Sequence, residues 1–298
     1  MTTDQHTLPR STWLLLAALT LGWGFNWPTM KIALAEIPVW TFRAICVTGG
    51  CAGLFFIAWR GGLRIRPPVG SASRLTVTAL CNVTLWNVLI GHGLTHLPAG
   101  RSVILVYTMP LWVVVLSHLM LGEKMTRRRL AGLSLGMAGM LVLLGNELAV
   151  LRSAPVGALL ILSAALSWAM GTVLMKRFPT DLPTVSFTGW QMLLGGIPLA
   201  IGALLIDPGN WRPIGWQALA AVLYNVFVAF IFCHWAWFTI VRRSPASVSA
   251  LGTLLIPIVG VFSSMLVLGE RLGWPEYAAM ALVLGALATV LVPPRGHR

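Results

Sequence analysis

Ten apolar runs, each about 20 residues long, follow one another along this chain of 298 residues. A helix that crosses a bilayer needs about 20 mostly apolar residues. The runs lack the apolar–polar alternation of membrane β-strands. Hydrophobic residues make up 57% of the chain and charged residues 10%, against about 45–50% and about 25% in soluble proteins. We therefore predict an all-α integral membrane protein with ten transmembrane helices. The predicted spans are 12–32, 38–59, 75–94, 98–121, 129–146, 154–176, 183–206, 217–240, 245–268 and 274–293.

The chain also repeats itself at nearly half its length. SHLMLGEK at residues 117–124 recurs as SMLVLGER at residues 264–271, 147 positions later. We interpret residues 1–150 and 151–298 as two copies of one five-helix unit within a single membrane domain. Because five is odd, the second copy enters the membrane from the opposite side, which is the inverted-repeat plan of many secondary transporters. Further matched pairs are Trp23 and Trp168, Lys31 and Lys176, Pro38 and Pro183, Phe42 and Phe187, Pro98 and Pro245, and Pro110 and Pro257.

The basic residues predict the orientation. With both termini in the cytoplasm, fifteen Lys and Arg side chains fall on the inside and five on the outside. Such a bias is the usual mark of cytoplasmic loops. It also accounts for the net charge of +13 without a nucleic-acid partner, because the basic residues form no single face or stripe. We predict a multi-pass protein of the cell inner membrane, with the lipid bilayer and a small-molecule substrate as its partners.

Prolines and glutamates mark equivalent places in the fourth and ninth spans. Pro110 and Pro257 lie near mid-span, each thirteen residues before a glutamate. Because a proline inside a helix removes one backbone hydrogen bond, both are predicted to act as hinges or kinks. The alternative is a kink that serves packing alone. Glu123 and Glu270 are expected to cap helix ends and to pair with loops rather than to bind substrate.

Polar and aromatic side chains gather near the middle of several spans. Trp23 and Asn26 share one face of the first span, and Trp168 occupies the matching place in the sixth. An asparagine in the membrane interior is costly unless it has a partner or water. Paired with aromatic rings, such amides predict a substrate cavity; ordinary helix–helix packing is the alternative. The candidate substrate-binding residues are Trp23, Asn26, Asn82, Trp86, Asn87, Tyr107, Trp168, Tyr224 and Asn225.

Other chemistries find little support in the sequence. The chain has no Walker motif and no HExxH motif, so neither an ATPase function nor a zinc protease function is predicted. The four cysteines lack metal-type spacing. We predict no catalytic residue, no metal, no cofactor, no ATPase subunit and no enzymatic activity. No Asp or Glu lies deep within a span, which argues against a carboxylate-driven antiporter of cations.

Two stretches carry a family resemblance. Residues 97–110, LPAGRSVILVYTMP, are followed by Leu-Gly-Glu-Lys at 121–124; residues 244–271 carry the second copy, with Ile256-Pro257 and Leu-Gly-Glu-Arg. The chain resembles the EamA-type branch of the drug/metabolite transporter superfamily over essentially its whole length. The resemblance implies export of amino acids and other metabolites through a central cavity lined mainly by spans 1, 3, 4, 6, 8 and 9. Its aromatic amino acid exporters (YddG-like) fit the aromatic lining best.

The hypothesis from sequence is therefore an exporter of amino acids, preferably aromatic, that works by alternating access. A rival in the same class carries organic anions or phosphorylated metabolites. That rival predicts that Arg43, Arg101 and Lys176 point into the cavity. Rivals of another class are a membrane receptor that moves nothing and an intramembrane enzyme.

Overall fold

A computed structural model describes residues 10–122, 127–145, 155–208, 213–237 and 246–291, and the regular secondary structure in these ranges is entirely helical. The prediction of an all-α membrane protein is confirmed. By length and composition, at least six helical segments can cross a membrane. They are Val39–Arg60, Ala72–His96, Ala99–Leu121, Pro155–Arg177, Thr184–Leu205 and Trp216–Trp237.

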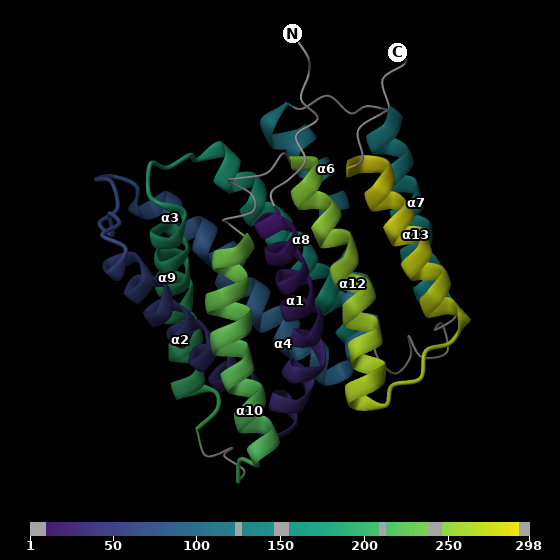
Figure 1. The fold of residues 1–298 in the computed structure, drawn as a ribbon. Coiled ribbons are helices and arrows are strands. Elements are labelled where there is room, and N and C mark those ends of the chain that lie inside the picture. The colour runs from purple at the N-terminus through teal and green to yellow at the C-terminus, as the bar shows by residue number, and fades with distance from the viewer. Residues whose placement is uncertain (1–9, 123–126, 146–154, 209–212, 238–245, 292–298) are drawn as a thin grey trace.

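Every predicted span coincides with a described helix or a run of joined helices (Figure 1). The first half holds α1 (Arg10–Glu36), α2 (Val39–Arg60), α3 (Ala72–Ala79), the π-helical segment η1 (Leu80–Leu85), α4 (Trp86–His96), α5 (Ala99–Val106), α6 (Met109–Leu121) and α7 (Arg127–Gly145). The second half holds α8 (Pro155–Arg177), α9 (Thr184–Leu205), α10 (Trp216–Tyr224), the π-helical segment η2 (Asn225–Cys233), α12 (Ala246–Leu268) and α13 (Trp274–Leu291).

The two π-helical segments occupy matching places in the repeat. Shifting η1 (Leu80–Leu85) by the repeat distance of 147 residues places it inside η2 (Asn225–Cys233). π-Helix is rare, occurs mostly as a single-turn insertion and is frequent at functional sites. Its occurrence in the third and eighth spans gives both halves the same irregularity at mid-span. The sequence analysis did not predict either segment.

The two predicted proline kinks differ from each other. The fourth span is broken: α5 ends at Val106, and α6 begins at Met109 with Pro110 in its first two positions. Proline lacks an N–H and its ring clashes with the carbonyl four residues earlier, which is that of Val106. Pro257, by contrast, lies inside the continuous helix α12. The fourth span is therefore broken before its proline, whereas the ninth keeps its proline inside one helix. The role of both prolines as hinges or kinks stays a prediction.

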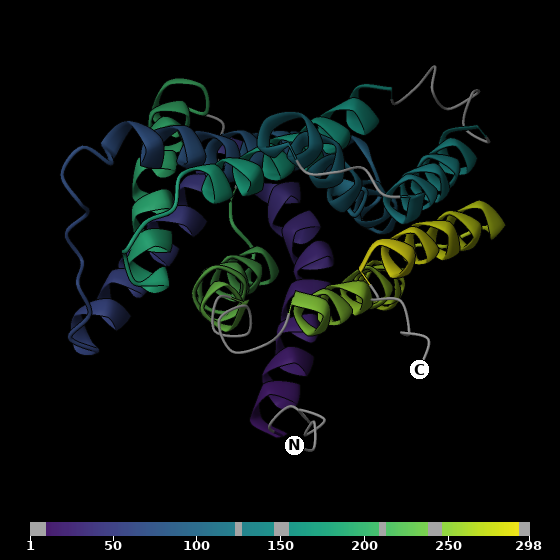
Figure 2. The same cartoon turned by 90° about the horizontal axis from the view of Figure 1, so that it is seen from above.

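Helix packing repeats when the halves are exchanged. α1 packs on α12 as α8 packs on α6, and η2 packs on α2 as η1 packs on α9. α2 packs on α9, and α7 packs on α13, so these contacts join equivalent helices of the two halves. Figures 1 and 2 show α1 in the middle, with α2 and α9 on one side and α7 and α13 on the other. This pattern of contacts is the one expected of duplicated halves.

The outer surface of the bundle is apolar. Large side chains such as Phe56, Leu119 and Leu204 are exposed, each on a different helix. A soluble monomer rarely exposes so much apolar surface, whereas lipid tails are a suitable neighbour for it. Polar side chains instead occur among the buried residues, including Asn82, Asn87, Gln191 and Asn225. The distribution fits a bundle that faces lipid and holds its polar groups inside.

Candidate functional site

A pair of tryptophans lies where η1 passes into α4. The ring centroids of Trp86, the first residue of α4, and Trp168, in the middle of α8, are 4.8 Å apart with their planes at 53°. Offset or tilted aromatic pairs at this distance attract each other. Ser167 donates to the carbonyl of Cys81 at 2.7 Å and so joins α8 to the π-helical segment beside the pair. The two predicted rings are thus brought together at mid-depth.

Asn82 lies beside this pair and is held from two helices. Its Nδ2 donates to Gln191 Oε1 of α9 at 3.3 Å and contacts Met175 Sδ of α8 at 3.4 Å. Its Oδ1 is buried and has no hydrogen-bond partner. The α8 residue next to it is Gly171, where an added Cβ would overlap the Asn82 amide. Only a glycine admits the asparagine here, so the pairing of α8 with η1 depends on both residues.

A second aromatic cluster lies where α1 packs beside η2. Trp23 of α1, which matches Trp168 in the repeat, packs edge-on against the ring of His234 with centroids 5.6 Å apart. A second ring, that of Trp237, lies 5.9 Å from Trp23. His234 occupies the position 147 residues after Asn87, and its Nδ1 is 2.8 Å from the Ala229 carbonyl inside η2. At this repeat position the first half has an amide, Asn87, and the second half has a ring, His234.

Asn87 and Asn225 orient their amides in the same way. Asn87 Nδ2 donates to the Val83 carbonyl at 2.8 Å, and Asn225 Nδ2 donates to the Ala221 carbonyl at 2.9 Å. Because a carbonyl only accepts, these bonds fix which amide atom is nitrogen. Both Oδ1 atoms therefore point away from their own helix, and both are buried without a partner. Each is an acceptor for which the described residues supply no donor.

The other predicted site residues differ in their contacts. The buried Oδ1 of Asn26 also lacks a partner. Tyr224 donates its hydroxyl to the Gly22 carbonyl at 2.9 Å, which ties α10 to α1. Asn225 Nδ2 donates to Thr29 Oγ1 of α1 at 3.4 Å. Tyr107 is buried at the break between α5 and α6. The contacts of Tyr224 and Asn225 thus join the eighth span to α1.

Sequence reasoning left out Gln191. This residue is buried in the middle of α9, its Oε1 accepts from Asn82, and its Nε2 has no partner. An amide within a membrane helix is costly and usually functional. That rule, applied to the seventh span, would have identified it.

The three basic residues named by the organic-anion hypothesis lie in different environments. Arg101 donates from Nε to the Glu276 carboxylate at 2.8 Å. Lys176 is exposed in the last turn of α8. Arg43 is buried, with only 2% of its surface exposed, so it does not extend to the membrane interface. One of the three basic side chains therefore lies in the interior.

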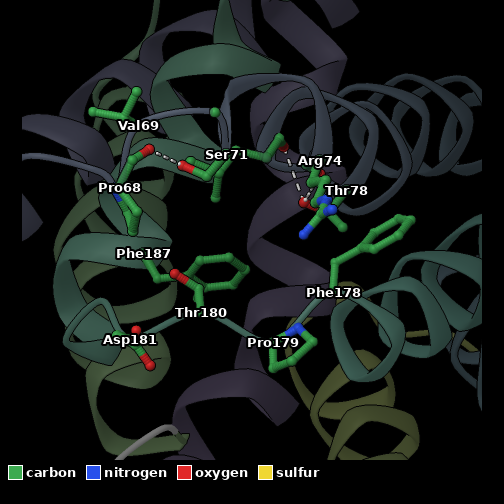
Figure 3. Close-up of a pocket in the computed structure, with 12 residues that line it drawn as sticks. Pro68, Val69, Ser71, Arg74, Thr78, Phe178, Pro179, Thr180, Asp181 and Phe187 are labelled. Carbon is green, nitrogen blue, oxygen red and sulfur yellow. Dashed lines mark hydrogen bonds between the residues drawn. The ribbon is translucent and has the colours of Figure 1, made fainter.

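A cavity of about 300 Å³ opens at the end of the bundle where α2 ends and α3 begins. Figure 3 shows Arg74 and Phe178 on one side of it and Asp181 on another. The guanidinium carbon of Arg74 lies 5.5 Å from the centroid of the Phe178 ring. None of the predicted site residues lines this cavity. It is separate from the polar groups at mid-depth.

The opposite end of the bundle is tied by carboxylates that accept from backbone N–H groups. Glu270 accepts from Ala99 and Gly100 at the start of α5, at 2.8 and 2.9 Å. Asp207 accepts from the Thr41 backbone at 2.8 Å. Since the first N–H groups of a helix lack partners within the helix, such carboxylates stabilise helix starts. Glu270 thus has the capping role predicted for it, whereas Glu123 lies outside the described residues. Two more contacts of this kind join Glu36 to Gly215 and Glu276 to Gly273.

Comparisons with a family model, with curated relatives and with a solved structure each match nearly the whole chain. The model of the EamA-like transporter family matches residues 10–145 and again residues 155–292. The chain is 34% identical to "Uncharacterized transporter YvbV" of Bacillus subtilis (strain 168), over 95% of this chain and 92% of the relative. It is 26% identical to the "Probable amino-acid metabolite efflux pump" of Escherichia coli (strain K12), over 94% of each chain. A solved structure described only as a crystal structure of a protein shares the fold, with a TM-score of 0.69 and 21% identity over 95% of this chain and 97% of that one.

Proposed function

Because the chain belongs to the EamA-like transporter family, we propose that it exports amino acids, aromatic ones preferred, and related metabolites by alternating access. It is a transporter and not an enzyme. The transport site of this proposal lies among the polar and aromatic residues at mid-depth, between the contact of α8 with η1 and the contact of α1 with η2. We also propose that, within this family, the protein is most similar to the aromatic amino acid exporters (YddG-like).

One observation above all supports an amino acid as the substrate. Four asparagine Oδ1 atoms are buried without a partner, and they belong to spans 1, 3 and 8. Buried polar atoms are nearly always hydrogen-bonded, so unpaired ones require an explanation. An ammonium group offers three N–H donors to such acceptors. The Trp86–Trp168 pair supplies an adjacent aromatic surface for a flat side chain. The four atoms are the Oδ1 atoms of Asn26, Asn82, Asn87 and Asn225.

The proposed transport cycle uses two inverted halves, residues 1–150 and 151–298, with ten spans in all. The exchange of packing pairs between the halves supports this arrangement, as does the matched position of the two π-helical segments. In inverted-repeat transporters, one half rocks against the other around a site near the midplane. Pro257 and the break before Pro110 are the proposed points of bending.

The proposed location is the cell inner membrane, with both termini in the cytoplasm. Positive charge favours cytoplasmic loops, and fifteen of the basic side chains fall on that side. α1 begins and α13 ends at the same end of the bundle (Figure 1), as this orientation requires. The relative named as an amino-acid metabolite efflux pump supports the proposed direction and substrate class.

Flux of labelled phenylalanine through purified protein in liposomes tests the proposal. We expect uptake above that of protein-free vesicles, competition by unlabelled tryptophan, and a weaker signal for small apolar amino acids. Flux of other amino acids without phenylalanine would remove the aromatic preference only. No flux of any amino acid, with or without a pH gradient, would contradict the proposed function.

A further inference from the structure

Arg43 lies in the second turn of α2 and is among the largest fully buried side chains of the described structure. We propose that Arg43 binds the carboxylate of the transported substrate. This inference rests on the proposed function, since it assigns to the transport path a group that the amide and aromatic residues lack. It also defines the substrate class as amino acids with a free carboxylate.

The contacts of the guanidinium leave its charge uncompensated. Its Nη2 lies 3.2 Å from Met30 Sδ, and its carbon lies 5.0 Å from the centroid of the Phe42 ring. Its Nε is buried and has no hydrogen-bond partner. No hydrogen bond or ion pair joins Arg43 to a carboxylate in the part of the chain that the structure describes. A thioether and a ring face are weak partners for a cation.

Such a charge is costly in the interior of a membrane protein. Buried charges are normally paired or hydrogen-bonded, and an arginine within a membrane helix usually faces the bundle interior and marks a substrate or ion path. Two carboxylates near the start of α2, in space or along the chain, are already engaged: Asp207 accepts from Thr41, and Glu36 accepts from Gly215. An anionic group of the substrate is the missing counter-ion. Arginine suits a carboxylate because its planar fork donates two parallel N–H bonds.

The guanidinium packs against the neighbouring helix α4 at a glycine. Arg43 Nε lies 3.4 Å from the point where a Cβ at Gly91 of α4 would stand, so the guanidinium faces backbone without a side chain. Asn87 lies four residues earlier on α4, on the same helical face. Asn87 thus lies one helical turn along α4 from the glycine that the guanidinium contacts, and its Oδ1 has no donor among the described residues. An α-amino acid carries the two complementary groups, an ammonium for the amide oxygen and a carboxylate for the guanidinium.

Three compounds distinguish the contribution of the substrate carboxylate from that of its ammonium group. They are phenylalanine, phenylalaninamide, which lacks the carboxylate, and 3-phenylpropionate, which lacks the ammonium. Flux and ligand-induced thermal stabilisation are measured with wild type, Arg43→Met and Arg43→Lys. Arg60→Met, at the exposed end of the same helix, is the matched control for loss of a positive charge.

We expect wild type and Arg60→Met to transport phenylalanine and to discriminate against the amide by roughly tenfold or more, the value of a hydrogen bond to a charged group. Arg43→Met should lose phenylalanine flux by a similar factor and should no longer prefer phenylalanine over the amide. Arg43→Lys should restore part of that preference. A structural role would move the melting temperature of Arg43→Met without changing the ratio of phenylalanine to amide.

Two outcomes overturn the assignment: wild type that treats phenylalanine and its amide alike, or Arg43→Met that keeps the wild-type preference. Failure of the proposed function has a different signature. If no amino acid is transported but phenylalanine or 3-phenylpropionate still stabilises wild type and not Arg43→Met, the carboxylate site stands and the export function falls. If there is neither flux nor stabilisation that depends on Arg43, both are wrong.

Discussion

The carboxylate of Glu270, in the turn after α12, accepts a hydrogen bond from the backbone nitrogen of Gly100 at 2.9 Å. A second bond from Ala99 at 2.8 Å completes the cap of α5. The two partners are 170 residues apart and belong to different halves. The repeated Leu-Gly-Glu motif thus serves, in its second copy, to attach one half of the bundle to the other.

Replacing Glu270 by alanine should destabilise the protein by about 1 kcal/mol, because loss of a helix cap typically costs 0.5–2 kcal/mol. Thermal unfolding in detergent measures the change. Arg271→Ala, at the exposed neighbouring position, is the control and should leave the melting temperature unchanged. Equal melting temperatures for the Glu270 variant and wild type would show that the cap does not hold the halves together.

The repeat extends this prediction to Glu123, which lies outside the described residues. Ala246, the first residue of α12, lies 147 positions after Ala99, so we expect Glu123 to cap α12 as Glu270 caps α5. Glu123→Ala should then cost about as much as Glu270→Ala, and the two losses should add, because distant sites without shared partners are usually additive. A double variant no less stable than the single ones would contradict the equivalence.

The Trp86–Trp168 pair should determine the preference for aromatic substrates. Trp86→Ala removes one ring of a pair whose centroids are 4.8 Å apart. Aromatic contacts are worth about 0.5–1.5 kcal/mol beyond area burial, so phenylalanine flux should fall roughly two- to tenfold while alanine flux changes less. Trp59→Ala is the control, since Trp59 is exposed at the end of α2. Equal losses for phenylalanine and alanine would exclude a role of the ring pair in selectivity.

Gly171→Ala tests whether the position of Asn82 matters. The added Cβ would overlap the Asn82 amide, so either the amide or α8 must shift. Overpacking of this kind costs about 1–3 kcal/mol, and we expect flux to fall with it. Gly285→Ala is the matched control in α13, where an added Cβ meets nothing within 4 Å. Unchanged flux in Gly171→Ala would show that Asn82 takes no part in transport.

The sequence predicted the fold well because its signals are local or periodic. Apolar length located the helical segments to within a few residues, and matched residues at offsets of 145 and 147 identified the duplication. Both signals come from physical demands that act along the chain: the thickness of the bilayer and the packing of a repeated unit.

Features that depend on long-range contacts were not predictable. The π-helical segment Leu80–Leu85 has an ordinary apolar sequence, and its shape accompanies contacts with α8 and α9. Arg43 lies near a span end, where sequence alone allows both a side chain that reaches the interface and one that attracts a carboxylate. Its burial follows from the packing of α2 against α1 and α4. The distinction between a broken helix at Pro110 and a continuous one at Pro257 likewise depends on tertiary packing.

The central claim is that two duplicated halves face opposite ways and enclose the transport site between them. Cysteines placed at Lys124 and Arg271, which match each other in the repeat, report this directly when a membrane-impermeant maleimide is applied to intact cells and to inverted vesicles. The account predicts labelling at 271 in intact cells only and at 124 in inverted vesicles only. Labelling of both positions from the same side would contradict it.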